Sequence, residues 1–260
     1  MFPKFIPLLF ALCTSCTLAN PDTTREKQQQ PRRSALIENP FKKIIDIPLP
    51  EGYKRMNVTQ GSFAEWLRAR DLKKDRTVYK YDGTPKYNQS AQFAVLDISV
   101  GNKDLQQCAD AVMRLRAEYF YASKDFDQLV FTDNDGTAYR FDPPYNRENF
   151  DKYLERVFGM CGSASLQKQM RSHIQMADIA PGDVLIHGGF PGHAEIVMDV
   201  AINNKGDKIY LLAQSYMPAQ DIHVLVNPMN ESLSPWYKVT DETVIKTPEY
   251  DFTKYELKRW

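Results

Sequence analysis

Residues 180–198 read APGDVLIHGGFPGHAEIVM, and this stretch decides the fold of the carboxy-terminal part of the chain. The apolar run at 184–186 predicts a strand, the glycines and proline of 188–192 predict a tight turn, and 194–198 predicts a second strand. His193 stands where the second strand begins. Because glycine lets the backbone approach closely in such a turn, we expect the imidazole of His193 at the edge of a cleft.

The last third of the sequence predicts an antiparallel meander whose turns are rich in Gly, Pro and Asn. Its four strands are expected at 183–187, 194–201, 208–214 and 221–226. The middle of the chain is expected to hold three helices and one hairpin, at 104–121, 147–158, 163–172 and 129–141 respectively. A helix-rich middle followed by a meander is typical of an α+β fold.

The segment before that middle predicts shorter elements. Strands are expected at 44–49, 77–81 and 93–100. The run Ser62-Phe63-Ala64-Glu65 matches a capping box, so a short helix that carries Trp66 and Leu67 should begin there.

Cys108 is the first candidate for chemistry, because it is expected within the first turn or so of the long helix, whether Asn102 or Asp104 is the N-cap. The amino terminus of a helix carries unpaired backbone N–H groups and a partial positive charge, which stabilise a thiolate. A thiolate is a nucleophile, and the backbone N–H of Cys108 is available for an oxyanion hole. Gln106 and Gln107 offer further donors, although exposed helix glutamines are common.

A structural role competes with this interpretation. Leu105, Cys108, Ala109 and Val112 fall on one helical stripe, so Cys108 also fits a small, buried, apolar position. Cys161 lies in the link between two predicted helices and has no matching histidine pattern. A disulfide between the two cysteines stays open for a protein in an oxidising compartment.

The order Pro-Gly-Asp, apolar strand, Gly-His, apolar strand at 181–198 resembles the NlpC-type and CHAP-type papain-like cysteine hydrolases of bacterial envelopes. The resemblance implies a core in which the helix of a nucleophilic cysteine packs on an antiparallel sheet. It implies Cys108 as the nucleophile and His193 as the general base. The likeness is weaker around Cys108, where Gln-Cys-Ala-Asp replaces the usual Asp-Cys-Ser-Gly and a longer span precedes the Gly-Asp pair.

In the same families a third residue orients the imidazole from the strand after the histidine strand. That strand is 209–215 in this chain, and Gln214 matches best by position. A glutamine carbonyl can accept from an imidazole N–H but brings no charge; an ordinary strand-end amide is the alternative for Gln214. His187, His193 and His223 lie near strand ends without a ligand spacing, so neither a metal nor another cofactor is expected.

The body of the chain also resembles an uncharacterised family of exported bacterial proteins that is classed as a domain of unknown function. The resemblance rests on GSFAEWL at 61–67, DLQQCADAVMR at 104–114 and the strand that begins Gly192-His193. It implies one continuous domain, taken as 41–260, and no established activity. Around a papain-like core, 41–100 is then an amino-terminal extension and 124–178 an insertion.

Residues 1–19 match a secretory signal peptide, with Lys4 followed by an apolar run and small residues. Cleavage is expected after Ala19, or else Cys16 is the acylated residue of a lipoprotein in the relaxed lipobox at 12–16. Residues 20–40, rich in Gln, Arg, Pro and Ser, predict a flexible linker. We therefore expect an exported protein, either periplasmic or held at the membrane of the bacterial cell envelope only through a lipid on Cys16.

The charges of the chain balance, because it has 33 Lys and Arg residues and 33 Asp and Glu residues. This balance limits the classes of partner that the sequence suggests. Without a basic excess, we expect no nucleic-acid partner. The sequence favours an envelope cysteine hydrolase, an amidase or endopeptidase, that works through a Cys–His thioacyl mechanism, and the resemblance implies peptidoglycan peptides as substrate. The alternatives are a catalytically inactive papain-like scaffold that acts as a surface binding or assembly lipoprotein, and an acyltransferase that uses the same pair.

Overall fold

The computed structural model describes residues 38–171 and 174–260. The predicted signal peptide, Cys16 and nearly all of the predicted linker lie outside these residues. The chain divides into two units, Met1–Ala35 and Leu36–Trp260, and all of the described residues belong to the second unit. No helix within the described residues combines the length and the apolarity needed to cross a membrane.

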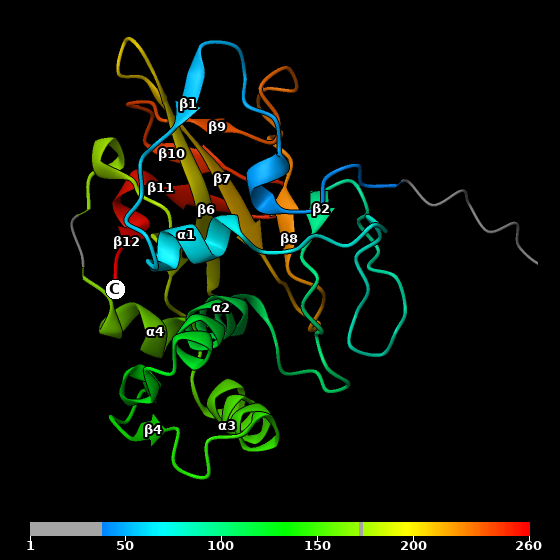
Figure 1. Cartoon of the computed structure of the whole chain (residues 1–260), viewed down its shortest axis with the longest axis vertical. Coiled ribbons are helices and arrows are strands. Elements are labelled where there is room, and N and C mark those ends of the chain that lie inside the picture. The colour runs from blue at the N-terminus through cyan, green and yellow to red at the C-terminus, as the bar shows by residue number, and fades with distance from the viewer. Residues whose placement is uncertain (1–37, 172–173) are drawn as a thin grey trace, which may run out of the picture. The chain divides into compact units, whose positions relative to one another are not determined.

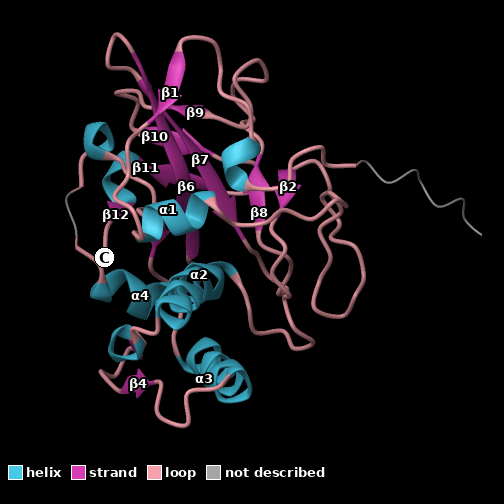
Figure 2. Ribbon diagram, viewed as in Figure 1, coloured by secondary structure: helices cyan, strands magenta, loops and turns pink. Residues whose placement is uncertain are grey.

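An antiparallel sheet of eight strands forms the centre of the described unit (Figures 1 and 2). Its strands follow the order β12-β5-β6-β7-β8-β2, while β1 pairs with β6 and β9 pairs with β7. The strands are β1 (Tyr53–Arg55), β2 (Gln92–Val95), β5 (Val184–His187), β6 (His193–Asn203), β7 (Lys208–Gln214), β8 (His223–Leu225), β9 (Tyr237–Lys238) and β12 (Leu257–Lys258). The predicted meander is therefore present as β5 to β8, with neighbouring strands paired in chain order.

The helices lie mainly before the meander in the chain. They are α1 (Phe63–Arg68), α2 (Cys108–Ser123), α3 (Arg147–Met160) and α4 (Ser163–Gln169), together with short 3₁₀ helices at Ile44–Asp46, Phe126–Gln128, Met176–Asp178 and Lys254–Glu256. Two small hairpins complete the fold, β3 (Val130–Thr132) with β4 (Ala138–Arg140) and β10 (Val244–Lys246) with β11 (Asp251–Thr253). The described unit is thus an α+β fold built on an antiparallel sheet, as the sequence predicted.

The strand β6 is buried on both faces, which sets the position of the core. Ile196 and Met198 join the larger apolar cluster, which includes residues of α2 and α3. Val197 and Val200 join a second cluster with Phe252. A strand covered on both faces reads as a continuous apolar run and not as an alternation, and this explains why the meander alternates so weakly in sequence.

The helix α2 begins later than the sequence suggested. Its N-cap is Gln107, whose backbone N–H donates to Asp110 Oδ2 at 3.0 Å, so Cys108 is the first helical residue. Asp104 caps nothing, because its Oδ1 accepts from the backbone N–H of Ala219 at 2.7 Å. The N-cap predicted at Asn102 or Asp104 is therefore wrong, and a tertiary bond to the loop after β7 is the reason.

Other differences fall in short elements near the ends of the domain. The predicted strand at 44–49 contains a 3₁₀ helix, and 77–81 forms only isolated bridges, such as Tyr79 with Pro85. The short strands after residue 230 were not predicted at all. Strands of two or three residues depend on their partners across the sheet, so their own sequence carries little signal.

The segment 124–178 contains β3, β4, α3 and α4, and it packs on the rest of the domain through α2. Both α3 and α4 contact α2, and α4 also contacts β5, the strand before the predicted site histidine (Figure 1). Phe150 and Leu154 on α3 belong to the same apolar cluster as Val112 on α2. The predicted insertion therefore shares the main core of the domain.

Candidate active site

The residues just before α2 are held against the loop that follows β7 by two sets of bonds. Asp104 accepts from the backbone N–H of Ala219. The Ser215 hydroxyl lies 2.9 Å from the carbonyl oxygen of Gln106 and 2.8 Å from that of Gln220. Because Gln214 is the last residue of β7, these bonds place Cys108 beside the strand end that carries the predicted third residue.

His193 is the first residue of β6 and lies between Cys108 and Gln214. Its Nε2 is 2.7 Å from Gln214 Oε1, and its ring is also hydrogen-bonded to the Cys108 side chain. A glutamine oxygen only accepts, so Nε2 carries a proton and Nδ1 is left for the thiol. The three residues predicted from sequence therefore meet at one place in the fold.

The orientation of the Gln214 amide is set by Glu249. Gln214 Nε2 donates to Glu249 Oε2 at 2.7 Å, which requires the amide oxygen to face His193. The same carboxylate is paired with the Lys86 ammonium and accepts from Asn88 Nδ2 at 3.2 Å. A series of polar contacts thus runs from Lys86 through Glu249 and Gln214 to the imidazole of His193.

His223 supports Gln214 from the other side. Its Nδ1 donates to the carbonyl oxygen of Asp221 at 2.8 Å, and its Nε2 lies 3.4 Å from Gln214 Nε2. Burial, reinforced by the nearby Lys86 charge, lowers the pKa of His223 to about 3. His223 is therefore neutral at physiological pH, and its Nε2 serves as an acceptor.

Glu195 is a member of the site that the sequence interpretation missed. It lies two residues after His193 on β6, so both side chains project from the same face of the strand. Its Oε1 is 3.5 Å from His193 Nε2 and 2.8 Å from the hydroxyl of Thr247. Its Oε2 is buried without a hydrogen-bond partner among the described residues. Alternation along the strand could have identified it, because a glutamate in a buried apolar run needs a nearby partner.

The charges around His193 favour the imidazolium. Burial alone lowers the pKa of His193, but the bonds and charges of Cys108 and Glu195 outweigh it and raise the pKa to about 10. Burial in turn raises the pKa of Glu195, and the contact with His193 opposes that change. The site is therefore built to keep a positive imidazolium beside the sulfur at neutral pH.

Aromatic rings surround the same imidazole. The ring centroids of Tyr216 and Tyr250 lie 4.9 Å and 5.0 Å from that of His193, and Phe252 follows at 5.9 Å. Aromatic faces attract a cation, so these rings stabilise the charged form of His193 and shield it from water. His193 is only 2% exposed.

A pocket of about 290 Å³ opens beside Cys108. Its walls come from the start of α2, the link between α3 and α4, and the turn before β6; the apolar lining residues include Phe158, Phe190 and Met217. Cys108 lines this pocket and is 7% exposed, while Phe190 is 90% exposed at the rim. The segment 124–178 supplies part of the wall, through Phe158, Cys161, Gly162 and Ser163.

Two glycines of the turn, Gly188 and Gly192, lie too close to α4 to carry a side chain without a shift. A Cβ on Gly192 would lie 2.1 Å from Ser163 Oγ and 2.6 Å from the carbonyl oxygen of His187. The Gly188 backbone N–H donates to Gln167 Oε1 at 2.5 Å. The turn that the sequence singled out therefore fixes the entry of β6, and with it the position of His193.

The remaining sequence candidates lie outside the Cys108–His193 contact. Gln107 lines the pocket, but the Gln106 side chain accepts from Arg114 at 3.4 Å on another side of α2. His187 is exposed and pairs with Glu256 at 2.6 Å. The described residues hold no group of three His, Cys, Asp or Glu side chains arranged to bind a metal.

Cys161 is also accounted for. Both Cys108 and Cys161 are free thiols, so the disulfide that the sequence left open is not formed. Burial and the charges of Asp133 and Asp110 raise the pKa of Cys161 to about 12. Cys161 lines the pocket wall and, as a protonated thiol, is a poor nucleophile.

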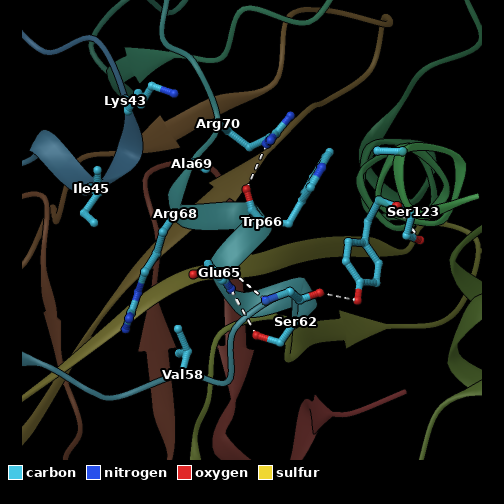
Figure 3. A pocket seen from close by; sticks show the side chains of 13 residues that line it. Lys43, Ile45, Val58, Ser62, Glu65, Trp66, Arg68, Ala69, Arg70 and Ser123 are labelled. Atoms are coloured by element: carbon cyan, nitrogen blue, oxygen red, sulfur yellow. Dashed lines mark hydrogen bonds between the residues drawn. The ribbon is translucent and has the colours of Figure 1, made fainter.

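A larger pocket, of about 620 Å³, lies at the other end of α2 and is shown in Figure 3. The Arg70 guanidinium stands 3.6 Å from the Trp66 ring centroid, and its Nε donates to the Trp66 carbonyl oxygen at 2.9 Å. Arg68 points to Asp199 with its Nε 2.5 Å from the carboxylate. No cysteine or histidine is among the residues that line this pocket. The larger pocket is therefore not the one that contains the candidate reactive residues.

Comparison with known proteins supports a family but no activity. No curated protein and no solved structure matches the chain significantly. One family model, described as domain of unknown function 4846, matches residues 45–144 and 140–259, which include Cys108, His193, Glu195 and Gln214. These matches span most of the chain, as the resemblance in the sequence implied, and the chain belongs to the family of domains of unknown function 4846.

Proposed function

We propose that this domain is a cysteine hydrolase with a papain-like core. The observation that carries the proposal is the line of contacts from Cys108 to His193 to Gln214, with the cysteine at the first position of α2. A helix amino terminus stabilises a thiolate, and the imidazolium beside it does the same. A pocket at the sulfur gives a substrate room to approach.

The reaction has two steps. The Cys108 thiolate attacks the carbonyl carbon of an amide or ester, and the His193 Nδ1 proton passes to the leaving nitrogen or oxygen as the carbonyl–heteroatom bond breaks. The product of this step is a thioester on Cys108. Water, deprotonated by the now neutral His193, then attacks the thioester, releases a carboxylic acid and returns the thiolate–imidazolium pair.

The groups around the pair support this sequence of proton transfers. Gln214 holds Nε2, so Nδ1 keeps facing the sulfur in both steps. As the first helical residue, Cys108 has a backbone N–H without an intrahelical acceptor, which can bind the oxyanion. Gln107 lines the same pocket and its amide donates to Asp104 at 3.2 Å, leaving a second N–H for that oxyanion.

For the substrate, we propose peptide amides of the cell envelope, with peptidoglycan stem peptides as the first class to test. This rests on the signal-like sequence at 1–19, the lipobox at Cys16 and the resemblance of 180–198 to envelope hydrolases. We accordingly propose that the protein is exported and works in the periplasm or at the membrane surface as a lipoprotein.

The test is digestion of purified sacculi and of soluble muropeptides by protein that lacks residues 1–19, with products identified by mass spectrometry. We expect new peptide ends that appear with wild-type protein and disappear with Cys108→Ala. A substrate analogue with a slow leaving group should leave an acyl mass on the peptide that carries Cys108. Absence of both turnover and acyl adduct, with Cys108 also inert to alkylation, would refute the hydrolase.

One observation favours a second function. Cys108 and His193 are almost fully shielded, at 7% and 2% exposed. A catalytically inactive papain-like scaffold that serves as a surface binding or assembly lipoprotein would tolerate such shielding. It predicts that Cys108 resists small alkylating reagents in the folded protein, whereas the hydrolase predicts fast labelling, so one measurement separates the two.

A further inference from the structure

The pocket beside Cys108 is acidic. Of its fifteen lining residues, all within the described part of the chain, Asp104 and Asp110 are the acids, and no Lys, Arg or His is among them. Phe158, Phe190 and Met217 supply apolar surface in the same pocket. A negatively charged ligand would gain no counter-ion from this lining, whereas a ligand with N–H donors would meet carboxyl oxygens.

The two acids differ in how their oxygens are used. Asp104 Oδ1 accepts from the Ala219 backbone and from Gln107 Nε2, so it is committed to holding the loop and the helix together. Asp110 uses Oδ2 to accept from the Gln107 backbone N–H. Asp110 is only 6% exposed, and its Oδ1 is buried without a hydrogen-bond partner in the described structure.

A buried carboxyl oxygen without a partner is unfavourable, because it has lost water and gained no donor. Burial accordingly raises the pKa of Asp110 well above its ordinary value. A donor from a ligand would satisfy this oxygen. Asp110 and Cys108 both line this pocket, so a ligand bound there could contact both residues.

We infer that the pocket binds an acyl group that carries an N–H donor, an ammonium or an amide, and that Asp110 Oδ1 receives this donor. The inference deepens the proposed hydrolase by naming a class of substrate, and it rests on that proposal for the identity of the reacting atom. The carboxyl of Asp104 in the same pocket disfavours anionic acyl groups.

Small amides test the inference without turnover. Full-length Cys108→Ser protein is titrated with glycinamide, N-acetylglycinamide, betaine amide and N-acetylglycine, and the backbone amide signals of residues 104–110 and 189–192 are followed by NMR. Glycinamide offers an ammonium and N-acetylglycinamide a neutral secondary amide N–H. Betaine amide carries a quaternary nitrogen that has no N–H, and N-acetylglycine carries the secondary amide N–H beside a negative carboxylate. We expect glycinamide or N-acetylglycinamide to bind. The one that binds more tightly shows whether the pocket prefers an ammonium or an amide N–H.

Asp110→Asn on the Cys108→Ser background is the decisive variant, because its amide oxygen still accepts from Gln107 while the free acceptor becomes a donor. We expect the dissociation constant of the preferred ligand to rise about tenfold or more. Asp104→Asn removes a charge from the same pocket and is the matched control, with a smaller expected rise. Asp110→Ser serves if Asp110→Asn lowers the thermal midpoint strongly.

The inference would be overturned if N-acetylglycine, the anion, bound as well as glycinamide and N-acetylglycinamide, if no ligand shifted these signals, or if Asp110→Asn bound like its parent. Equal effects of the two aspartate variants would assign the selectivity to overall charge and not to Asp110. Because Cys108→Ser cannot turn over substrate, these outcomes are independent of the sacculus digestion. The proposed hydrolase activity can therefore be refuted while the proposed binding site is confirmed, and the opposite outcome is also possible.

Discussion

The imidazole of His193 and the carboxyl of Glu195 lie on one face of β6, with 3.5 Å between Nε2 and Oε1. Nε2 is therefore offered two acceptors, the neutral oxygen of Gln214 at 2.7 Å and the carboxyl oxygen of Glu195. The amide sets the direction of the ring, and the acid supplies the charge that a glutamine lacks. This division of roles leads to separate expectations for the two residues.

The first prediction concerns the dependence of Cys108 on His193. Because the imidazolium persists up to about pH 10, iodoacetamide should label Cys108 at pH 6 nearly as fast as at pH 8. Without an activating partner, a thiol of pKa about 8.5 is only ~0.3% ionised at pH 6, so His193→Ala should slow labelling roughly a hundredfold. Peptide mass spectrometry locates the label.

His187→Ala is the matched control for that experiment. His187 pairs with His193 across β5 and β6, but its side chain is exposed and bonded to Glu256. We expect this variant to label Cys108 like the wild type. An equal loss in both variants would show that the turn, and not the imidazole of His193, governs the thiol.

The second prediction concerns the charge of Glu195. An ordinary histidine has a pKa of about 6.5, so a folded-state pKa near 10 stabilises the fold fully below pH 6.5, and this stabilisation is lost as the pH rises through 10. Glu195→Gln should lower the pKa of His193 by about one to three units, which moves the loss to lower pH. NMR titration of the imidazole and thermal midpoints from pH 6 to 10 measure both effects; an unchanged pKa would mean that Glu195 is protonated in the native protein.

The third prediction concerns Gln214. Gln214→Ala leaves Glu249 without one of its donors, so we expect a loss of about 1–3 kcal/mol in the free energy of unfolding. Labelling of Cys108 should fall less than in His193→Ala, because Glu195 can still accept from Nε2. The double variant Gln214→Ala/Glu195→Gln should label Cys108 more slowly than the product of the two single effects on the rate predicts. If the two effects on the labelling rate simply combine, the residues do not share a role.

The fourth prediction concerns the glycine turn. Gly192→Ala places a Cβ 2.1 Å from Ser163 Oγ and 2.6 Å from a backbone oxygen, so the entry of β6 must shift. We expect a loss of about 1–3 kcal/mol, measured by urea unfolding, together with slower labelling of Cys108. Gly159→Ala meets no atom within 4 Å and lies in α3, so it should leave the labelling rate unchanged and, if anything, raise the free energy of unfolding by up to ~1 kcal/mol.

The fifth prediction concerns Cys161. Since burial and nearby acids raise its pKa to about 12, Cys161 should remain unlabelled in the folded protein from pH 6 to 9. Cys161→Ser should leave the rate at Cys108 unchanged, as read by peptide mass. Faster labelling of Cys161 than of Cys108 would contradict the assignment of Cys108 as the nucleophile.

The sequence predicted the meander because its strands and turns depend on local patterns. That Cys108, His193 and Gln214 meet was implied by the resemblance to papain-like hydrolases and not by any local pattern. The sequence missed Glu195, which looks like an isolated acid in an apolar run until Thr247 and His193 are placed around it. It placed the start of α2 too early because the bond from Asp104 to Ala219 joins residues far apart in the chain. Contacts of this range leave little trace in any short stretch of sequence.

The line of contacts behind the imidazole has a consequence for the architecture of the protein. Lys86 comes from the segment before α2, whereas Glu249, Tyr250 and Phe252 follow the meander. Segments on both sides of α2 and the meander therefore support His193, the earlier one only indirectly, because Lys86 pairs with Glu249 and Glu249 in turn binds Gln214. A fragment trimmed to α2 and the meander would keep Cys108 and His193 but lose Glu249, Tyr250 and Phe252, so we expect such a fragment not to hold the imidazole in place.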